Sequence, residues 1–281
     1  MATESGAAGS GETAPQARKR DFDTTVAHPA RIWDYWLGGK DNFAADREAA
    51  EKVLEVMPVI APIARANRGF LGTAVHHLSA EAGVRQFLDI GTGLPTASNT
   101  HEVAQRVAPE SRIVYVDNDP IVLTHAQALL TSDRRGATAY IDADIHDTEM
   151  ILAKAGETLN VSEPVAVMLL AILHFIPDED DPYGITARLM EALPPGSFLV
   201  LSHAANDIQA DAMAAGAQRY NEHSAVPITP RSREQVVRFF DGLEIVEPGV
   251  VPLGHWRPGP AASVTRPRLP GYSGVARKLK P

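Results

Sequence analysis

One short segment carries the residue types best suited to holding a charged small molecule. Gln86–Pro95 begins as an apolar run that contains Asp89, and it then turns through Gly91, Thr92 and Gly93. Glycines at such a turn allow the backbone to approach a ligand closely, and the helix that follows offers unpaired N–H groups to a negative group. The pattern predicts a ligand-binding loop between a strand and a helix.

Asp89 is the most informative residue of this segment because it lies inside an otherwise apolar strand. A buried carboxylate is too costly to leave unpaired. An ammonium group, such as the methionyl amine of S-adenosylmethionine, would compensate it, whereas a diphosphate would be repelled. A dinucleotide site would also have a third glycine or alanine where this chain has Thr96. The alternative is that Asp89 only accepts backbone N–H groups in a tight turn, and we favour the ligand.

The next predicted strand ends in a second group of polar residues. Asp117 stands at the strand tip, close to the roughly 20-residue spacing at which an acid meets a ribose hydroxyl pair. We therefore assign ribose binding to Asp117 and include its neighbour Asn118 in the site. Asp119 precedes Pro120 at a helix start, where N-capping explains it fully.

The third predicted strand is followed by the acidic segment Asp142–Asp147. A carboxylate at this tip can accept the adenine amino group while a neighbouring N–H contacts the ring, and Asp144 and Ile145 suit these roles. The rival interpretation is a metal site built from Asp and His oxygen and nitrogen atoms. Acids in a loop before a helix are more often caps and solvated charges, so we predict no metal.

A histidine follows the fourth predicted strand. His174 lies in the apolar run Ala166–Pro177, just past the carboxyl end of the strand. If the ligand is S-adenosylmethionine, its methyl group would be delivered to an acceptor molecule at this place. An oxygen or nitrogen acceptor needs to lose a proton, and His174 or His203 would serve as the base near neutral pH. A satisfied structural histidine is an equal alternative.

These residues need a scaffold that brings strand tips together, and the rest of the chain predicts one. Short apolar strands alternate with helical segments from residue 84 onward, which is typical of a parallel sheet covered on both faces. Only a proline-rich segment, Arg257–Pro270, joins the last two strands, so they are expected to form an antiparallel hairpin. The strands are expected at Gln86–Ile90, Arg112–Val116, Thr138–Ile141, Val165–Leu170, Ser197–Ser202, Leu243–Val250 and Tyr272–Arg277. The helices are expected at Thr96–Val107, Pro120–Thr131, Thr148–Ala155, Tyr183–Leu193, Ile208–Glu222 and Ser232–Phe240.

The residues before this region divide into two parts. Residues 1–20 are small and polar, which predicts a disordered tail, and residues 21–83 predict a helical extension before the domain at residues 84–281. In the extension, Asp41-Asn42 can cap a helix that runs to Val56, and a third helix is expected from Ile63 to about Gly83.

The first helix of the extension has an aromatic face. Ile32, Tyr35 and Trp36 are spaced to lie on one side of a helix that Gly38-Gly39 ends. We expect residues 31–43 to cover the cofactor as a lid, with Tyr35 and Trp36 as its apolar face. The alternative is a helix buried against the sheet for stability alone.

The bulk composition limits the partners. With 26 Lys and Arg against 35 Asp and Glu, the net charge is -9, which disfavours nucleic acid and anionic membranes as partners. There is no cysteine, so disulfides and thiolate chemistry are excluded, and the absence fits a reducing cytoplasm. The apolar run Val165–Ile176 is too short for a membrane span. We expect a cytoplasmic protein.

Taken together, the segments from Val84 to Lys280 resemble the class I S-adenosylmethionine-dependent methyltransferases. The resemblance implies a Rossmann-like α/β fold whose seven-stranded, mostly parallel sheet has an antiparallel last strand, and it implies S-adenosylmethionine as cofactor. A narrower set of motifs resembles a bacterial methyltransferase family long catalogued as a domain of unknown function. Those motifs are His28–Phe43, Ala66–Arg68, Gln86–Pro95, Val116–Pro120 and Ile172–Phe175.

The resemblance implies methyl transfer but no particular acceptor, and the oligomeric state stays open. We expect an S-adenosylmethionine-dependent methyltransferase acting on a small molecule, because transfer from a sulfonium mainly requires positioning of the acceptor. One alternative is a non-catalytic regulatory protein that binds S-adenosylmethionine. A second is an NAD-dependent oxidoreductase, which Asp89 and the missing third glycine disfavour.

Overall fold

The computed structural model describes residues 23–129, 132–257 and 267–280. The predicted tail at residues 1–20 therefore lies outside the described residues. An eight-stranded sheet has the order β3-β2-β1-β4-β5-β8-β6, with β7 paired to β8. The strands are β1 (Gln86–Ile90), β2 (Arg112–Asp117), β3 (Ala137–Asp142), β4 (Ala166–Leu170), β5 (Phe198–Ala204), β6 (Glu244–Ile245), β7 (Val251–Pro252) and β8 (Gly271–Arg277). The helices are α1 (Pro29–Leu37), α2 (Ala44–Val56), α3 (Ile60–Ala80), α4 (Thr100–Val107), α5 (Pro120–Leu129), α6 (Thr148–Ala155), α7 (Pro182–Glu191), α8 (Ala210–His223) and α9 (Arg233–Val237), with short 3₁₀ turns at Leu173–Phe175, Asp178–Asp180 and Arg238–Phe240.

The sheet confirms the predicted class of fold. Strands β1 to β5 pair in parallel, and β8 runs antiparallel to β5. The predicted sixth strand, Leu243–Val250, is wrong in detail, because two two-residue strands, β6 and β7, take its place. Pro248 and Gly249 lie between them, and proline has no N–H with which to continue a ladder. Strand order reverses around β1, which is where ligands bind in open α/β sheets.

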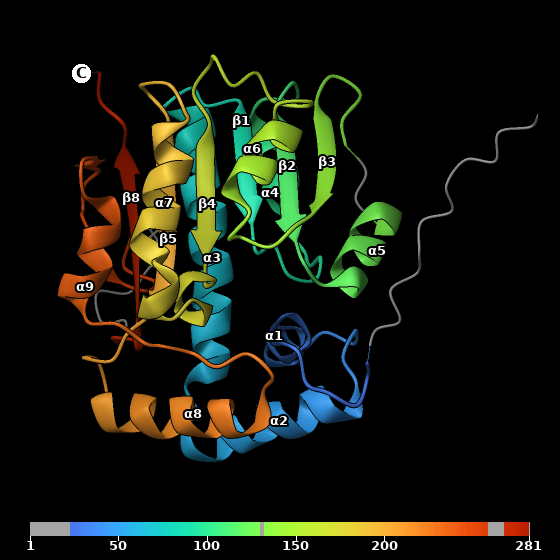
Figure 1. The fold of residues 1–281 in the computed structure, drawn as a ribbon, viewed down its shortest axis with the longest axis vertical. Coiled ribbons are helices and arrows are strands. Elements are labelled where there is room, and N and C mark those ends of the chain that lie inside the picture. Colours follow the sequence, from blue (N-terminus) through green and yellow to red (C-terminus); the bar gives the residue numbers. More distant parts are fainter. Residues whose placement is uncertain (1–22, 130–131, 258–266, 281) are drawn as a thin grey trace, which may run out of the picture.

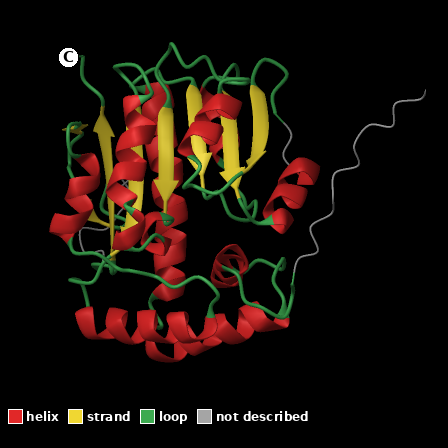
Figure 2. Ribbon diagram, in the orientation of Figure 1, coloured by secondary structure: helices red, strands yellow, loops and turns green. Residues whose placement is uncertain are grey.

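Two hydrophobic clusters cover the two faces of the sheet. Figure 2 shows helices in front of the strands and behind them. The alternation of β1 places Phe87 in one cluster and Leu88 and Ile90 in the other. Asp89 has the parity of Phe87, so it lies on the face covered by α3 and α4. The buried stripe of α3 predicted from Ile63 to Leu78 belongs to the same cluster, and Pro62 is tolerated because it lies in the first turn.

Three helices lie across the carboxyl ends of the parallel strands. Figure 1 shows α2 and α8 side by side at this end of the molecule, with α1 between them and the sheet. Buried residues of α1, α2 and α8 share a hydrophobic cluster with the sheet, among them Ile32, Val53 and Met213. This arrangement encloses the edge of the sheet at which β1, β2 and β4 end. No described helix is long and apolar enough to span a bilayer.

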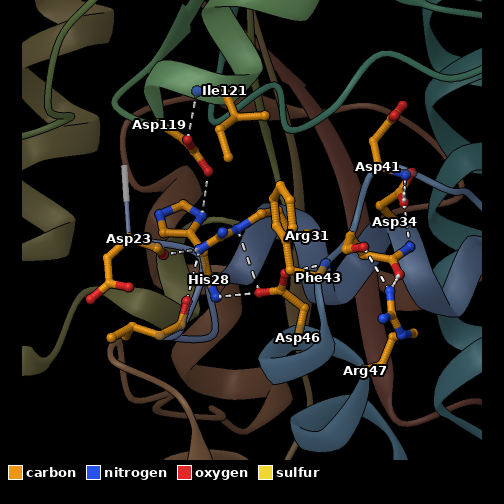
Figure 3. A network of polar contacts seen from close by, with 12 residues as sticks. Asp23, His28, Arg31, Asp34, Asp41, Phe43, Asp46, Arg47, Asp119 and Ile121 are labelled. Atoms are coloured by element: carbon orange, nitrogen blue, oxygen red, sulfur yellow. Dashed lines mark hydrogen bonds and ion pairs between the residues drawn. The ribbon is translucent and has the colours of Figure 1, made fainter. Parts of the chain in front are cut away.

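One fully buried carboxylate organises the start of this cap (Figure 3). Asp46 accepts the backbone N–H of His28 at 2.9 Å and that of Phe43 at 2.8 Å, and its carboxylate lies 3.4 Å from the guanidinium of Arg31. The predicted cap of α2 by Asp41-Asn42 is therefore wrong. The N-cap residue is Phe43, and Asp46, in the first turn of α2, accepts its backbone N–H as the acid of a capping box does.

The displaced cap residues stabilise the preceding turn instead (Figure 3). Asp34 accepts the N–H of Asp41 at 2.9 Å and the side-chain amide of Asn42 at 2.8 Å. A Cβ atom at Gly39 would lie 1.9 Å from the carboxylate of Asp34, so any larger residue would push this carboxylate away from its partners. Asp34 thereby fixes the path from α1 into α2.

Asp46→Ala should lower the free energy of unfolding by about 3 kcal/mol, because breaking a buried ion pair leaves the Arg31 charge uncompensated. Urea denaturation at pH 7 measures the change. Glu48 is exposed on the same helix, and Glu48→Ala should change the stability by less than about 0.5 kcal/mol. Equal effects of the two substitutions would contradict the role given to Asp46.

Candidate functional site

A cavity of about 290 Å³ lies at the carboxyl ends of β1, β2 and β3. All eight residues predicted to bind the cofactor line it. They are Asp89, Gly91, Thr92, Gly93, Asp117, Asn118, Asp144 and Ile145. Residues predicted separately at three strand tips thus lie around one cavity, because parallel strands present their carboxyl ends at the same edge of the sheet.

Asp89 is buried at the inner wall of this cavity. The hydroxyl of Thr100, from α4, donates to its Oδ2 at 2.6 Å. Burial raises the pKa of the Asp89 carboxyl to about 6, although the Thr100 hydrogen bond and the nearby Arg68 charge act in the opposite direction. The shift means that ionising this carboxyl costs roughly 3 kcal/mol more than it does in water. A bound ammonium would offset this cost.

The glycine turn is shaped by close packing and by positive φ angles. Gly91 has φ +72°, and a Cβ atom there would lie 2.1 Å from Ile172. Gly93 has φ +66° with open space at its Cβ position, and its N–H donates to Asp117 Oδ2 at 2.9 Å. The Thr92 hydroxyl donates to the carbonyl of Asp89 at 3.1 Å and so closes the turn.

The helix after this turn begins later than expected. We predicted Thr96–Val107, but α4 begins at Thr100, so its first N–H groups do not follow Gly93 directly. Asn99 is the N-cap, and Glu102 Oε2 accepts the Asn99 N–H at 2.9 Å. The spacing of Asn99 and Glu102 is a capping signal that would have located this start.

Asp117 is buried at the tip of β2. Besides the Gly93 N–H, it accepts the N–H of Asp119 at 3.0 Å. Burial raises the pKa of its carboxyl against these hydrogen bonds. Each carboxylate oxygen has a second lone pair, so Asp117 retains capacity to accept hydroxyl groups of a ligand.

The tips of β2 and β3 are joined at the mouth of the cavity. Asn118 donates its amide to Asp144 Oδ2 at 3.1 Å, and Asp144 also accepts the N–H of His146 at 3.0 Å. Burial acts to raise the pKa of the Asp144 carboxyl, but the contacts with His146 and Asn118 outweigh it and lower the pKa. Ile145 is buried beside them and supplies an apolar wall.

Helix α1 closes one side of the cavity, but not with the face we expected. Ala30, Trp33 and Leu37 line the cavity. Tyr35 instead points toward α2, where its hydroxyl donates to Glu51 at 2.9 Å. Trp36 is buried, donates to the carbonyl of Ala50 at 3.3 Å and lines a smaller cavity beside the first one. The helical spacing identified the apolar side of α1 that packs on α2. The first cavity is lined by a different side of the helix, which carries Ala30, Trp33 and Leu37.

Two contacts at this site were not anticipated from the sequence. His28 Nδ1 lies 2.9 Å from Asp119 Oδ2 and connects the start of α1 to the loop after β2 (Figure 3). Asp119 also caps α5 as predicted, because its Oδ1 accepts the Ile121 N–H at 2.8 Å. Arg68, from α3, lines the cavity and donates to the carbonyls of Ala97 at 3.1 Å and Ser98 at 3.2 Å.

His174 lies in the 3₁₀ turn after β4, away from the first cavity. It lines a second cavity of about 50 Å³ that adjoins the first. Its Nδ1 is buried and has no hydrogen-bond partner among the described residues. Burial lowers the pKa of His174 well below its usual range, so the imidazole is neutral at pH 7.

The strand order, the reversed last strand and the position of the cavity define a class I methyltransferase fold. Mitomycin 7-O-methyltransferase MmcR shares this fold at 17% identity, with a TM-score of 0.51, over 91% of this chain and 74% of that protein. The chain matches the family model described as S-adenosyl methyltransferase over residues 15–279, and it belongs to this family. S-adenosylmethionine is accordingly the cofactor. The buried Asp89 carboxylate, whose charge Thr100 and Arg68 offset only in part, suits its ammonium group.

Two solved structures are similar over nearly their whole length. A DUF574 family protein from Streptomyces avermitilis is 46% identical, with a TM-score of 0.87, over 91% of this chain and 99% of that protein. A candidate methyltransferase from Thermobifida fusca is 38% identical, with a TM-score of 0.85, over 92% and 97% of the two chains. No curated protein matches the chain significantly.

Cofactor affinity should depend on pH through Asp89. The pKa of this carboxyl is raised to about 6 in the folded chain. Its protonated form therefore stabilises the fold, and this stabilisation is fully present below pH 3.8, the ordinary pKa, and is lost as the pH rises through about 6. Binding an ammonium requires the ionised form, so affinity for S-adenosylmethionine should fall by up to about tenfold per unit below pH 6.

Calorimetry from pH 5 to pH 8 tests this dependence. Asp89→Asn should bind more weakly at pH 7 and lose the pH dependence, while its melting temperature at pH 7 is not lowered, because a buried charge has been removed. A variant that keeps the full pH dependence would show that another group is responsible.

Proposed function

We propose that this chain transfers a methyl group from S-adenosylmethionine to a small-molecule acceptor. The observation that carries the proposal is the cavity in which three strand tips present carboxylates beside an arginine, those of Asp89 and Asp117 buried and that of Asp144 partly exposed. When bound, S-adenosylmethionine supplies a methyl carbon that bonds to the acceptor while the sulfonium sulfur keeps the bonding electron pair.

Each end of such a cofactor would meet complementary residues. Asp89 would bind the methionyl ammonium, directly or through water, and Arg68 would face the methionyl carboxylate. Asp117, with Asn118, would accept the ribose hydroxyl groups, and Asp144 with the N–H of Ile145 would bind the adenine edge. Because the three carboxylates lie at different strand tips, they discriminate an extended cationic ligand from a diphosphate, which they would repel.

The chain's own contribution to the chemical step is positioning and desolvation. Helix α1 covers the cavity and would limit access of water. The neutral imidazole of His174 can accept a hydrogen bond from an acceptor O–H or N–H. As the new bond to carbon forms, the acceptor's proton passes to this imidazole, which then releases it to water. The division of the chain into a helical cover, residues 21–83, and a cofactor-binding domain, residues 84–281, belongs to this proposal.

Asp117→Ala should weaken S-adenosylmethionine binding at least tenfold, because two ribose hydrogen bonds to a charged group are lost. Calorimetry measures the dissociation constant, and thermal melting monitors the fold. Asp241 is an exposed acid remote from the cavity, and Asp241→Ala should leave binding unchanged. An unaltered dissociation constant in Asp117→Ala would remove Asp117 from the ribose site.

His28→Ala should release α1 from the loop after β2 and so accelerate dissociation of S-adenosylhomocysteine several-fold. Stopped-flow fluorescence follows this rate, since Trp33 lines the cavity. His76 is exposed on α3, and His76→Ala is the control. If α1 only stabilises the fold, His28→Ala will lower the melting temperature and leave the dissociation rate unchanged.

A further inference from the structure

The second cavity shares four lining residues with the first: Trp33, Asn67, Ala171 and Phe175. We call it the acceptor chamber. Its wall is formed mainly by residues of α1, α2, α3, β5 and α8 and by His174 and Phe175 of the 3₁₀ turn after β4. We propose that it holds the methyl acceptor, and that the acceptor is a small uncharged molecule with a single ring and one O–H or N–H group. This inference rests on the proposed methyl transfer.

The wall of the acceptor chamber carries no charge. None of its lining residues is Asp, Glu, Lys or Arg. Burial lowers the pKa of His174 well below its usual range and that of His203 to about 3, so both are neutral at pH 7. A charged acceptor would lose its hydration without gaining a counterion, which is strongly unfavourable. The chamber therefore selects a neutral molecule.

Aromatic side chains form much of the wall. The ring centroids of Trp33 and Trp36 lie 5.9 Å apart, with an angle of 68° between the ring planes. The ring centroids of Trp36 and Tyr220 lie 6.3 Å apart. Phe175 lies 6.1 Å from Tyr220 on the other side. A planar ring can make edge or stacking contacts with such a wall. The chamber's volume of about 50 Å³ is below the roughly 150 Å³ of a cavity that encloses benzene. A single ring therefore fits only where it also occupies the opening to the first cavity, and a polymer is excluded.

Asn67 supplies a hydrogen-bond donor where the two cavities meet. Ser202 Oγ accepts the Ala171 N–H at 2.9 Å, so its own hydrogen is free to point to Asn67 Oδ1, 2.6 Å away. This contact fixes the orientation of the amide and turns Nδ2 away from Ser202. No described residue accepts a hydrogen bond from Nδ2, which can therefore donate to the oxygen or nitrogen of an acceptor.

His174 supplies the matching acceptor, and His203 does not. His203 Nε2 lies 3.0 Å from a nitrogen of Arg231, which can only donate, so Nδ1 carries the hydrogen and donates to the Ala204 carbonyl at 2.8 Å. Both nitrogens of His203 are thus engaged. The imidazole of His174 makes no hydrogen bond within the described chain, and it is the histidine that can accept the acceptor's O–H or N–H.

Calorimetry with phenol, toluene and benzoate tests the acceptor chamber, using the full chain saturated with S-adenosylhomocysteine. Phenol should bind about threefold to tenfold more tightly than toluene, which lacks the hydroxyl. Benzoate should show no binding, because its charge would be buried without a partner. His174→Phe should abolish the preference for phenol over toluene.

A matched pair of substitutions on α8 gives the second test. Ala217 lines the chamber, so Ala217→Leu should fill it and weaken phenol binding at least tenfold, with S-adenosylhomocysteine binding unchanged. Ala214 is exposed on the same helix, and Ala214→Leu should change neither. Failure to bind S-adenosylhomocysteine would refute the proposed function itself. Cofactor binding without phenol binding, tight benzoate binding, or full phenol affinity in Ala217→Leu would overturn the chamber alone.

Discussion

The burial of one negative charge, on Asp89, is the constraint around which the site is arranged. A carboxylate in the interior of a sheet must be compensated, and the chain brings two helices to it. Thr100 donates to it from the first residue of α4, and Arg68 approaches it from α3. These contacts leave the pKa of the carboxyl raised to about 6. Thr100 and Arg68 thus offset only part of the cost of burying the negative charge of Asp89, so a cationic ligand is favoured beside it.

The parts predictable from the sequence are those that local pattern and topology determine together. Apolar strands alternating with helices imply a parallel sheet, and acids at strand tips must then meet at one edge. Asp89, Asp117 and Asp144 were found in this way although each lies in a separate segment, and the structure places all of them on one cavity. Helix starts failed where a cap was overlooked, as with Asn99 before α4 and Asp46 in α2.

The parts that could not be predicted depend on contacts between distant segments. Helical spacing shows that α1 has an apolar side, but not what that side meets. Tyr35 meets α2, whereas Trp36 both contacts α2 and lines the second cavity. The contact between His28 and Asp119 joins residues far apart in the chain, and no local signal marks it. Asn67 carries a local signal that we did not use: a polar residue in the otherwise apolar stripe of α3 points to a buried polar contact, and its partner is Ser202.

The two cavities differ in charge, and this difference determines how reactants would be oriented. Carboxylates and Arg68 surround the first, while the second has neutral walls. A charged cofactor is therefore stabilised only in the first cavity, and a neutral ring loses least in the second. Because burial lowers the pKa of His174, an imidazolium there would be unstable and would soon release its proton. His174 thus suits an orienting hydrogen bond more than storage of a proton, and the acceptor's own acidity must carry much of the deprotonation.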